Sequence, residues 1–191
     1  GVVWESTIRR GLEKLEVLKN TITRTLLLHE SDHPMDNEVR AMCYDKKRHL
    51  TFLCNKRGSI FIQDDNGKPV GTITHDSSGK PIGRPYGMSV DSKGNYWVCD
   101  KDNGIYKITP NGSGYNVVNI RHDDKDIWSL SANSAYQAVE DHEGNIWVAT
   151  YGGGVNILRK NKAGKYVTLH AKNALKQAKI GRAVQQECRD R

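Results

Sequence analysis

The sequence predicts an all-β fold, a β-propeller with about four blades' worth of four-stranded antiparallel sheets. One pattern recurs every 45–50 residues along the 191-residue chain, which is the blade period of a propeller. Each copy contains four short segments that are typical of strands. An Asp-x-x-Gly turn separates the first two segments, and its glycine favours the left-handed conformation that closes a hairpin with a bulge.

The copies align through the same landmarks. The clearest read YGMSVDSKGNYWVCDKDNGIYKI at 86–108 and YQAVEDHEGNIWVATYGGGVNIL at 136–158, and a looser copy covers 40–62. The shared positions are the aspartates Asp45, Asp91, Asp141 and Asp190, the aromatics Trp4, Phe52, Trp97 and Trp147, and the turn glycines Gly11, Gly58, Gly104 and Gly154. The aromatics lie mid-strand, where we expect them to pack in the core between neighbouring blades.

The landmarks divide the chain as one propeller segment, 1–191. We expect a partial blade at 1–39, blades at 40–85, 86–135 and 136–184, and the first strand of another blade at 185–191. The sequence leaves the turn conformation of the second copy undecided, because His49 stands there at the position of Gly94 and Gly144 in the third and fourth copies. We favour an arc of a larger propeller. The alternative is a small ring, closed by pairing of the last strand with the first blade.

A histidine ends the fourth strand-like segment of each copy. The segments are TLLLH, GTITH, VVNIRH and YVTLH, ending at His29, His75, His122 and His170. The string HESDH at 29–33 also matches the zinc-protease signature H-E-x-x-H, which has meaning only on a helix. Pro34 disfavours helical geometry at His33, and the other three copies lack a second histidine. The pattern therefore favours a strand end over a zinc site.

Composition argues against nucleic-acid binding, a membrane helix and a disulfide or metal framework. The net charge of +7 comes from a basic segment at 159–191 with ten Lys/Arg and two acids, leaving −1 for the rest. That segment has Tyr166 as its one aromatic, so nucleic-acid binding is not expected. No apolar run reaches the length of a membrane helix. The cysteines Cys43, Cys54, Cys99 and Cys188 lack metal spacing and occupy repeat positions, which indicates packing residues instead of disulfides.

The string DHEGNIWVATYGGGV at Asp141–Val155 closely resembles the two-component regulator propeller repeat. The resemblance extends strongly over the third and fourth copies and loosely over the first two. It implies the periplasmic sensor region of a bacterial hybrid two-component sensor, in which a β-sandwich, a membrane helix and a kinase follow the propellers. It further implies a carbohydrate ligand or a supporting role in a signalling homodimer, with the rest of the sensor chain as partner, and any membrane attachment through those other parts.

Candidate ligand-binding residues lie where loops converge on one face of a propeller. The connections that follow His122 and His170 are three or four residues longer than the earlier ones, and extra loop length on a fixed scaffold is typical of recognition. Trp128 lies in the first of these. The expected binding residues are Arg40, Arg84, Tyr86, Asp100, Trp128, Tyr136 and Tyr151. Each of them is also compatible with a plain surface or edge-covering role.

No catalytic residue, metal ligand or cofactor is expected. DKDNG at 100–104 differs from a calcium loop in the place of its glycine and in Asn111 at position twelve. Two alternatives stay open. A propeller lyase, similar to streptogramin-inactivating enzymes, would require acid–base and metal-binding residues at the central mouth. A scaffold without a small ligand would hold a partner chain on its faces or edges.

Overall fold

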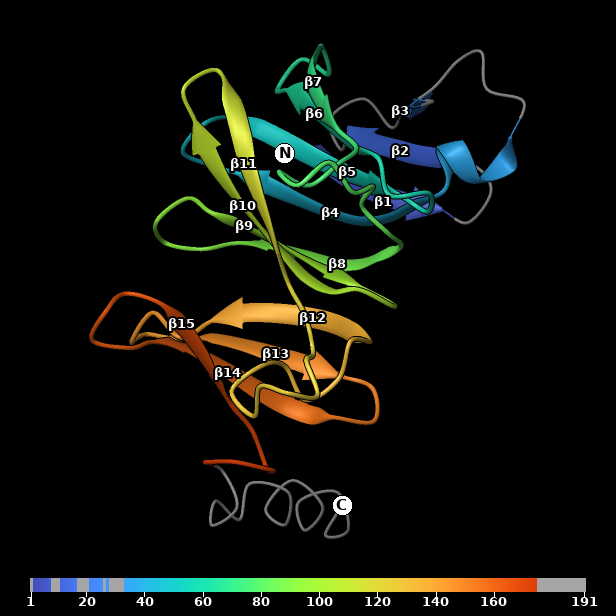
Figure 1. Cartoon of the computed structure of the whole chain (residues 1–191). Coiled ribbons are helices and arrows are strands. Elements are labelled where there is room, and N and C mark those ends of the chain that lie inside the picture. The colour runs from blue at the N-terminus through green and yellow to red at the C-terminus, as the bar shows by residue number, and fades with distance from the viewer. Residues whose placement is uncertain (1, 8–10, 17–20, 26, 28–32, 175–191) are drawn as a thin grey trace, which may run out of the picture.

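The computed structural model describes residues 2–7, 11–16, 21–25, 27 and 33–174 (Figure 1). These residues form antiparallel sheets in which each strand pairs with its neighbour in sequence. The first sheet, blade one, contains β1 (Val2–Thr7), β2 (Gly11–Glu16) and β3 (Thr21–Thr25). The predicted all-β propeller fold is confirmed. Among the described residues, no helix is long and apolar enough to span a membrane.

The other three sheets each have four strands. Blade two contains β4 (Val39–Asp45), β5 (Leu50–Asn55), β6 (Ile60–Asp64) and β7 (Pro69–Ile73). Blade three contains β8 (Pro85–Val90), β9 (Tyr96–Asp100), β10 (Gly104–Asn111) and β11 (Gly114–Ile120). Blade four contains β12 (Ala135–Glu140), β13 (Ile146–Thr150), β14 (Gly154–Lys160) and β15 (Tyr166–Leu169). A single turn of 3-10 helix, η1 (Pro34–Asn37), precedes β4.

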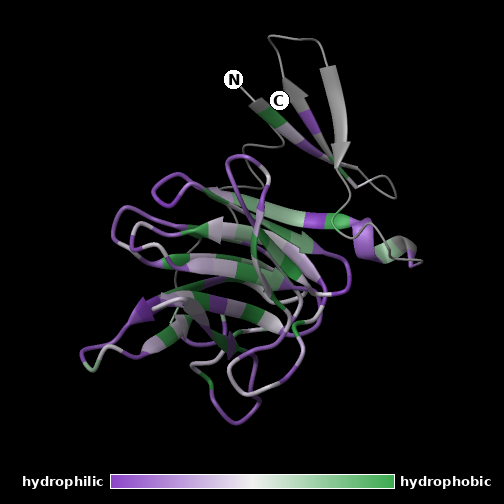
Figure 2. Cartoon of the chain, turned by 90° about the horizontal axis from the view of Figure 1, so that it is seen from above, coloured by the Kyte–Doolittle hydropathy of each residue, from purple (hydrophilic) through white to green (hydrophobic). Residues whose placement is uncertain are grey.

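The blades follow one another as an arc. The first strands of blades two, three and four, β4, β8 and β12, contact one another in succession, and blades one and four lie at opposite ends of the row (Figure 1). Apolar residues concentrate on the strands and polar residues on the loops (Figure 2). The segment 185–191, on which the alternative of a closed ring rests, lies outside the described residues.

The repeat aspartate builds the turn that begins each hairpin. Asp91 Oδ1 accepts hydrogen bonds from the backbone N–H groups of Lys93 and Asn95, at 3.0 and 2.8 Å. Its Oδ2 accepts from the Asn95 side chain at 2.8 Å and from the Trp97 indole N–H at 3.0 Å. Gly94 adopts a φ of 78°, where a Cβ would be strained. The string D-x-x-G-N-x-W therefore encodes a turn with its own internal partners.

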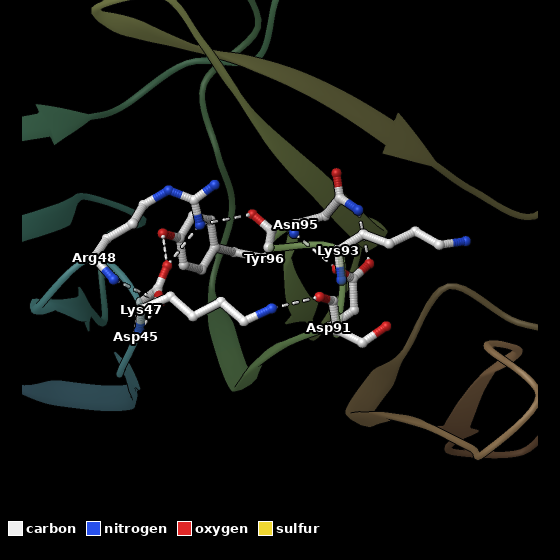
Figure 3. Close-up of polar contacts among 9 residues, drawn as sticks. Asp45, Lys47, Arg48, Asp91, Lys93, Asn95 and Tyr96 are labelled. Atoms are coloured by element: carbon white, nitrogen blue, oxygen red, sulfur yellow. Dashed lines mark hydrogen bonds and ion pairs between the residues drawn. The ribbon is translucent and has the colours of Figure 1, made fainter.

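The corresponding turn of blade two forms without a glycine. His49 takes the left-handed conformation itself, with a φ of 56°. Asp45 Oδ1 accepts from the N–H groups of Lys47 and Arg48. The side chain of Phe52 has no N–H to donate, and Asp45 Oδ2 instead accepts from the Tyr96 hydroxyl of blade three at 2.6 Å (Figure 3). In blades three and four this carboxylate oxygen accepts a hydrogen bond from the tryptophan of the same blade. In blade two it accepts one from the neighbouring blade three.

Apolar clusters fill the spaces between blades. The largest lies between blades two and three, where the Phe52 and Tyr96 rings pack with centroids 4.0 Å apart. Trp97 anchors the next one, against blade four, and Leu12, Val39 and Leu53 form the smallest, between blades one and two. Cys54 and Cys99 are fully buried members of these clusters, and burial raises the pKa of the Cys99 thiol to about 12. The described cysteines are unpaired; Cys188 lies outside the described residues.

Three of the repeat histidines lie just beyond the outer strands of their blades. His75, His122 and His170 follow β7, β11 and β15 within two residues. His29 lies outside the described residues, as does Glu30. His33 precedes η1, and its Nδ1 accepts a hydrogen bond from the Met35 N–H at 3.2 Å. His33 is therefore the capping residue of a short 3-10 turn and not part of an α-helix.

Candidate functional site

One end of the arc carries most of the predicted binding residues. There β4, β8 and β12 begin, and the loops that follow β5, β9 and β13 cross the same end. A backbone hydrogen bond joins the loop to the strand start in blades two, three and four: Lys56 N–H to Glu38 O at 2.9 Å, Lys101 N–H to Arg84 O at 2.9 Å, and Tyr151 N–H to Ser134 O at 2.8 Å. The repeated bond fixes each loop beside the start of the first strand of its own blade.

Four of the predicted residues form a continuous row across this end. The Arg40 guanidinium lies 5.7 Å from the Tyr86 ring centroid. The Tyr86 and Tyr136 rings are 5.2 Å apart, and the Tyr136 and Tyr151 rings 6.5 Å apart. Tyr136 is 41% exposed and Tyr151 75% exposed. We call Arg40, Tyr86, Tyr136 and Tyr151 the tyrosine row; it crosses blades two, three and four.

A buried carboxylate positions the start of the row. Glu38 is 4% exposed and lies 2.7 Å from the Arg40 guanidinium and 3.0 Å from Lys56 Nζ. Two cations around one buried acid compensate its desolvation and leave the cluster with a net positive charge. The sequence interpretation missed Glu38 and Lys56, and no motif marks them. An acid directly before an inner strand was the one available signal.

Arg84 and Trp128 lie apart from the row. Arg84 pairs with Asp102 at 2.7 Å, with both side chains about half exposed, an arrangement that contributes little to stability. Trp128 is 47% exposed on the connection 121–134. Its carbonyl accepts from Thr168 N–H at 2.9 Å, which fastens this connection to β15, the last strand of blade four.

Asp100 differs from its expected role. Its side chain is fully buried, and Oδ1 accepts from the N–H groups of Asp102 and Asn103, both at 2.8 Å. Burial raises the pKa of the carboxyl. Asp100 thus caps the loop after β9 and presents no group to a ligand at the surface. Among the described residues, no group of three or more His, Cys, Asp and Glu side chains is placed to hold a metal ion.

A buried histidine contacts the connection that carries Trp128. His170 is 4% exposed. Its Nδ1 accepts from Lys172 N–H, so Nε2 carries the proton and donates to Ile127 O at 3.2 Å. Burial, together with the nearby Lys172 and His122, lowers the pKa of His170 below 6.5, although the bond to Ile127 opposes this shift.

Because the folded state favours neutral His170, its stabilising contribution is present above the unfolded pKa of about 6.5 and is lost as pH falls below it. We expect the melting temperature of the wild type to decrease as the pH falls through 6. His170→Gln keeps a donor for Ile127 but cannot titrate, so its melting temperature will fall less over the same range. Equal pH dependence in the two proteins, measured by circular dichroism, would contradict the assignment.

Comparisons with known proteins agree with this architecture. Residues 129–152 match the model of a family described as two component regulator propeller. No curated protein matches the chain significantly. The extracellular domain of the putative hybrid two component system BT4673 from B. thetaiotaomicron is similar at 20% identity, with a TM-score of 0.65 over 85% of this chain. That of BT3049 from the same organism has 17% identity and a TM-score of 0.65 over 86%.

A β-propeller domain from Myceliophteria thermophila has 14% identity and a TM-score of 0.62, with 88% of this chain and 55% of that one covered. The chain spans 20% of the BT4673 domain and 21% of the BT3049 domain. The match at 129–152 falls on the copy whose resemblance is strongest, and this confirms the resemblance. The chain is a β-propeller arc whose residues 129–152 match the two component regulator propeller family.

Proposed function

We propose that this chain is a segment of the extracytoplasmic, periplasmic sensor region of a two-component signalling protein, and that it binds a carbohydrate through the tyrosine row. The matched repeat and the similar extracellular domains support the sensor role. The observation that carries the ligand class is the row itself. Its rings stand 5.2 and 6.5 Å apart, and two of them are well exposed.

The chemistry of the row suits a sugar chain. A tyrosine offers an apolar ring face and a hydroxyl, which match the C–H face of a pyranose and its ring of hydroxyl groups. Arg40 adds a cation held in place by Glu38, and guanidinium N–H groups donate in a fixed fork. The row favours an extended neutral or acidic oligosaccharide that contacts successive blades.

In this role the chain binds and transmits, and performs no chemistry. Its partners are the rest of the sensor chain and a second copy of that chain in a signalling homodimer. The row contains no acid–base pair, which favours binding over the lyase alternative. Hydrolysis or elimination of a bound glycan by the purified chain would reverse that preference.

The test is a thermal-shift screen against neutral and acidic oligosaccharides, because a ligand in excess of its dissociation constant raises the melting temperature. We expect Tyr136→Ala, at the centre of the row, to weaken binding by about tenfold or more. Val139→Ala truncates an exposed residue of the same strand and serves as the matched control. If both variants bind equally well, the row is not the site. If no oligosaccharide shifts the wild type, the scaffold alternative is preferred.

A further inference from the structure

The residue directly before the repeat aromatic decides how each space between blades is filled. This residue is Thr51 in blade two, Tyr96 in blade three and Ile146 in blade four. Tyr96 is fully buried, stacks on Phe52 with centroids 4.0 Å apart, and donates to Asp45 (Figure 3). Ile146 is 1% exposed and packs in the cluster that contains Trp97. Large side chains therefore fill the interface between blades two and three and the interface between blades three and four.

In the interface between blades one and two, the residue at this position is the smaller Thr51. Thr51 lies opposite Tyr44 in the ladder between β4 and β5, so both side chains are on the same face of the sheet. A groove of about 490 Å³ lies there, between blades one and two, within the range of small-molecule sites. Its lining includes Trp4, Lys14, Tyr44, Thr51, Asp64 and Asp65.

The repeat aromatic beside this groove also differs from its counterparts. Phe52 and Trp97 are at most 1% exposed, because the residue before the next repeat aromatic lies against each of them. Trp4 is half-buried, and Tyr44 is 47% exposed. A groove lined by an indole and a phenol thus occurs between blades one and two, whereas the Tyr96 ring fills the interface between blades two and three.

Polar groups surround this aromatic space. The Tyr44 hydroxyl donates to Asp65 Oδ1 at 3.0 Å, and His49 Nδ1 lies 2.7 Å from Asp65 Oδ2. Asp64 caps its own turn by accepting from the N–H groups of Asn66 and Lys68. Lys14 Nζ lies 5.8 Å from the Trp4 ring centroid. A purely aromatic guest would remove water from the two carboxylates and offer them no donor in return.

We propose that the groove between blades one and two binds one pyranose ring of a mono- or disaccharide. The C–H face of the sugar stacks on Trp4, much as Tyr96 stacks on Phe52, and its hydroxyls donate to Asp64 and Asp65. Tyr44 is adjacent to Asp45, at the end of β4 opposite Arg40. The groove is therefore a second site, on the opposite end of the blades from the tyrosine row, and does not rest on the function proposed for the row.

Isothermal titration calorimetry on the 191-residue chain tests the proposal. The probes are glucose, galactose, N-acetylglucosamine, maltose, cellobiose and lactose, with p-cresol as the aromatic comparison. They are titrated to about 10 mM, where a millimolar dissociation constant is still measured. We expect at least one sugar to bind. Thr51→Tyr places a phenol in the groove, as Tyr96 does between blades two and three, and we expect it to weaken binding by about tenfold or more.

Controls separate the two sites. Val118→Tyr adds a phenol at an exposed position of β11 and should leave binding unchanged. Should Thr51→Tyr not fold, Tyr44→Ala removes one wall of the groove and should weaken binding instead. Loss in Thr51→Tyr with retention in Tyr136→Ala supports the groove. The reverse pattern places the sugar on the tyrosine row and overturns the groove. Binding of p-cresol alone, or of none of the probes, also overturns it.

Discussion

Replacement of Tyr96 by alanine should lower the free energy of unfolding by about 4 kcal/mol, the range observed when a buried aromatic side chain is truncated. Tyr96 is fully buried between blades two and three. The substitution removes the ring that packs on Phe52 and leaves a cavity. It also removes the hydroxyl that donates to Asp45 at 2.6 Å (Figure 3). Urea unfolding followed by circular dichroism gives the change in free energy.

Tyr96→Phe separates packing from hydrogen bonding. It keeps the ring, so we expect a smaller loss of about 1.5–3 kcal/mol, typical of a buried hydrogen bond with a charged partner. Asp45 Oδ2 then keeps Arg48 Nη1 at 2.8 Å. Burial by itself raises the pKa of Asp45, but the bonds from Tyr96 and Arg48 outweigh it and lower the pKa. If Tyr96→Ala costs no more than Tyr96→Phe, the ring is not the wedge between these blades.

Removal of the Asp91 carboxylate should have the next largest effect. Asp91→Ala eliminates four hydrogen bonds and leaves the indole N–H of Trp97 without a partner. Trp97 is 1% exposed, so water cannot replace the lost acceptor. An unsatisfied buried donor together with an uncapped turn should lower the free energy of unfolding by about 3 kcal/mol. The same urea titration measures it.

Asp141→Ala is the matched comparison in blade four. Asp141 accepts the same set of bonds, including Trp147 Nε1 at 2.7 Å. Trp147 is partly exposed, so water can satisfy its indole N–H after the substitution. We therefore expect a clearly smaller loss of stability. Equal losses in Asp91→Ala and Asp141→Ala would show that the turn, and not the burial of the indole, determines the cost.

The sequence was sufficient for the repeating part of the molecule. Asp-x-x-Gly, the aromatic and the second glycine lie close together in the chain, and their bonds connect residues at most six positions apart, as in Asp91 to Trp97. Such local interactions recur in full in blades three and four and, without the indole bond, in blade two. They predict the turn, the hairpin and the blade. The same periodicity identified His29 as a repeat position and removed the reason to expect a zinc site.

The candidate site depends on side-chain contacts between residues far apart in the chain, which the sequence alone does not reveal. Tyr86, Tyr136 and Tyr151 were predicted singly, from their places at strand starts and loops. The 5.2 Å spacing of Tyr86 and Tyr136 arises from the packing of blade three against blade four, across 50 residues of chain. The 6.5 Å spacing of Tyr136 and Tyr151 arises within blade four, where the loop after β13 lies beside the start of β12. Asp100 shows the opposite outcome: its place on a loop suggested exposure, but the loop folds back on the carboxylate and buries it.

The sequence by itself thus determined the fold and the end of the blades at which loops meet, because these follow from local hydrogen bonds and from strand alternation. The tertiary structure decided which side chains meet, because each interface is formed by the faces of two blades. The side chains on those two faces vary independently in the sequence. Tyr96 and Thr51 occupy the same repeat position. One closes its interface, and the other leaves a groove of about 490 Å³, a difference that becomes visible once the neighbouring blade is in place.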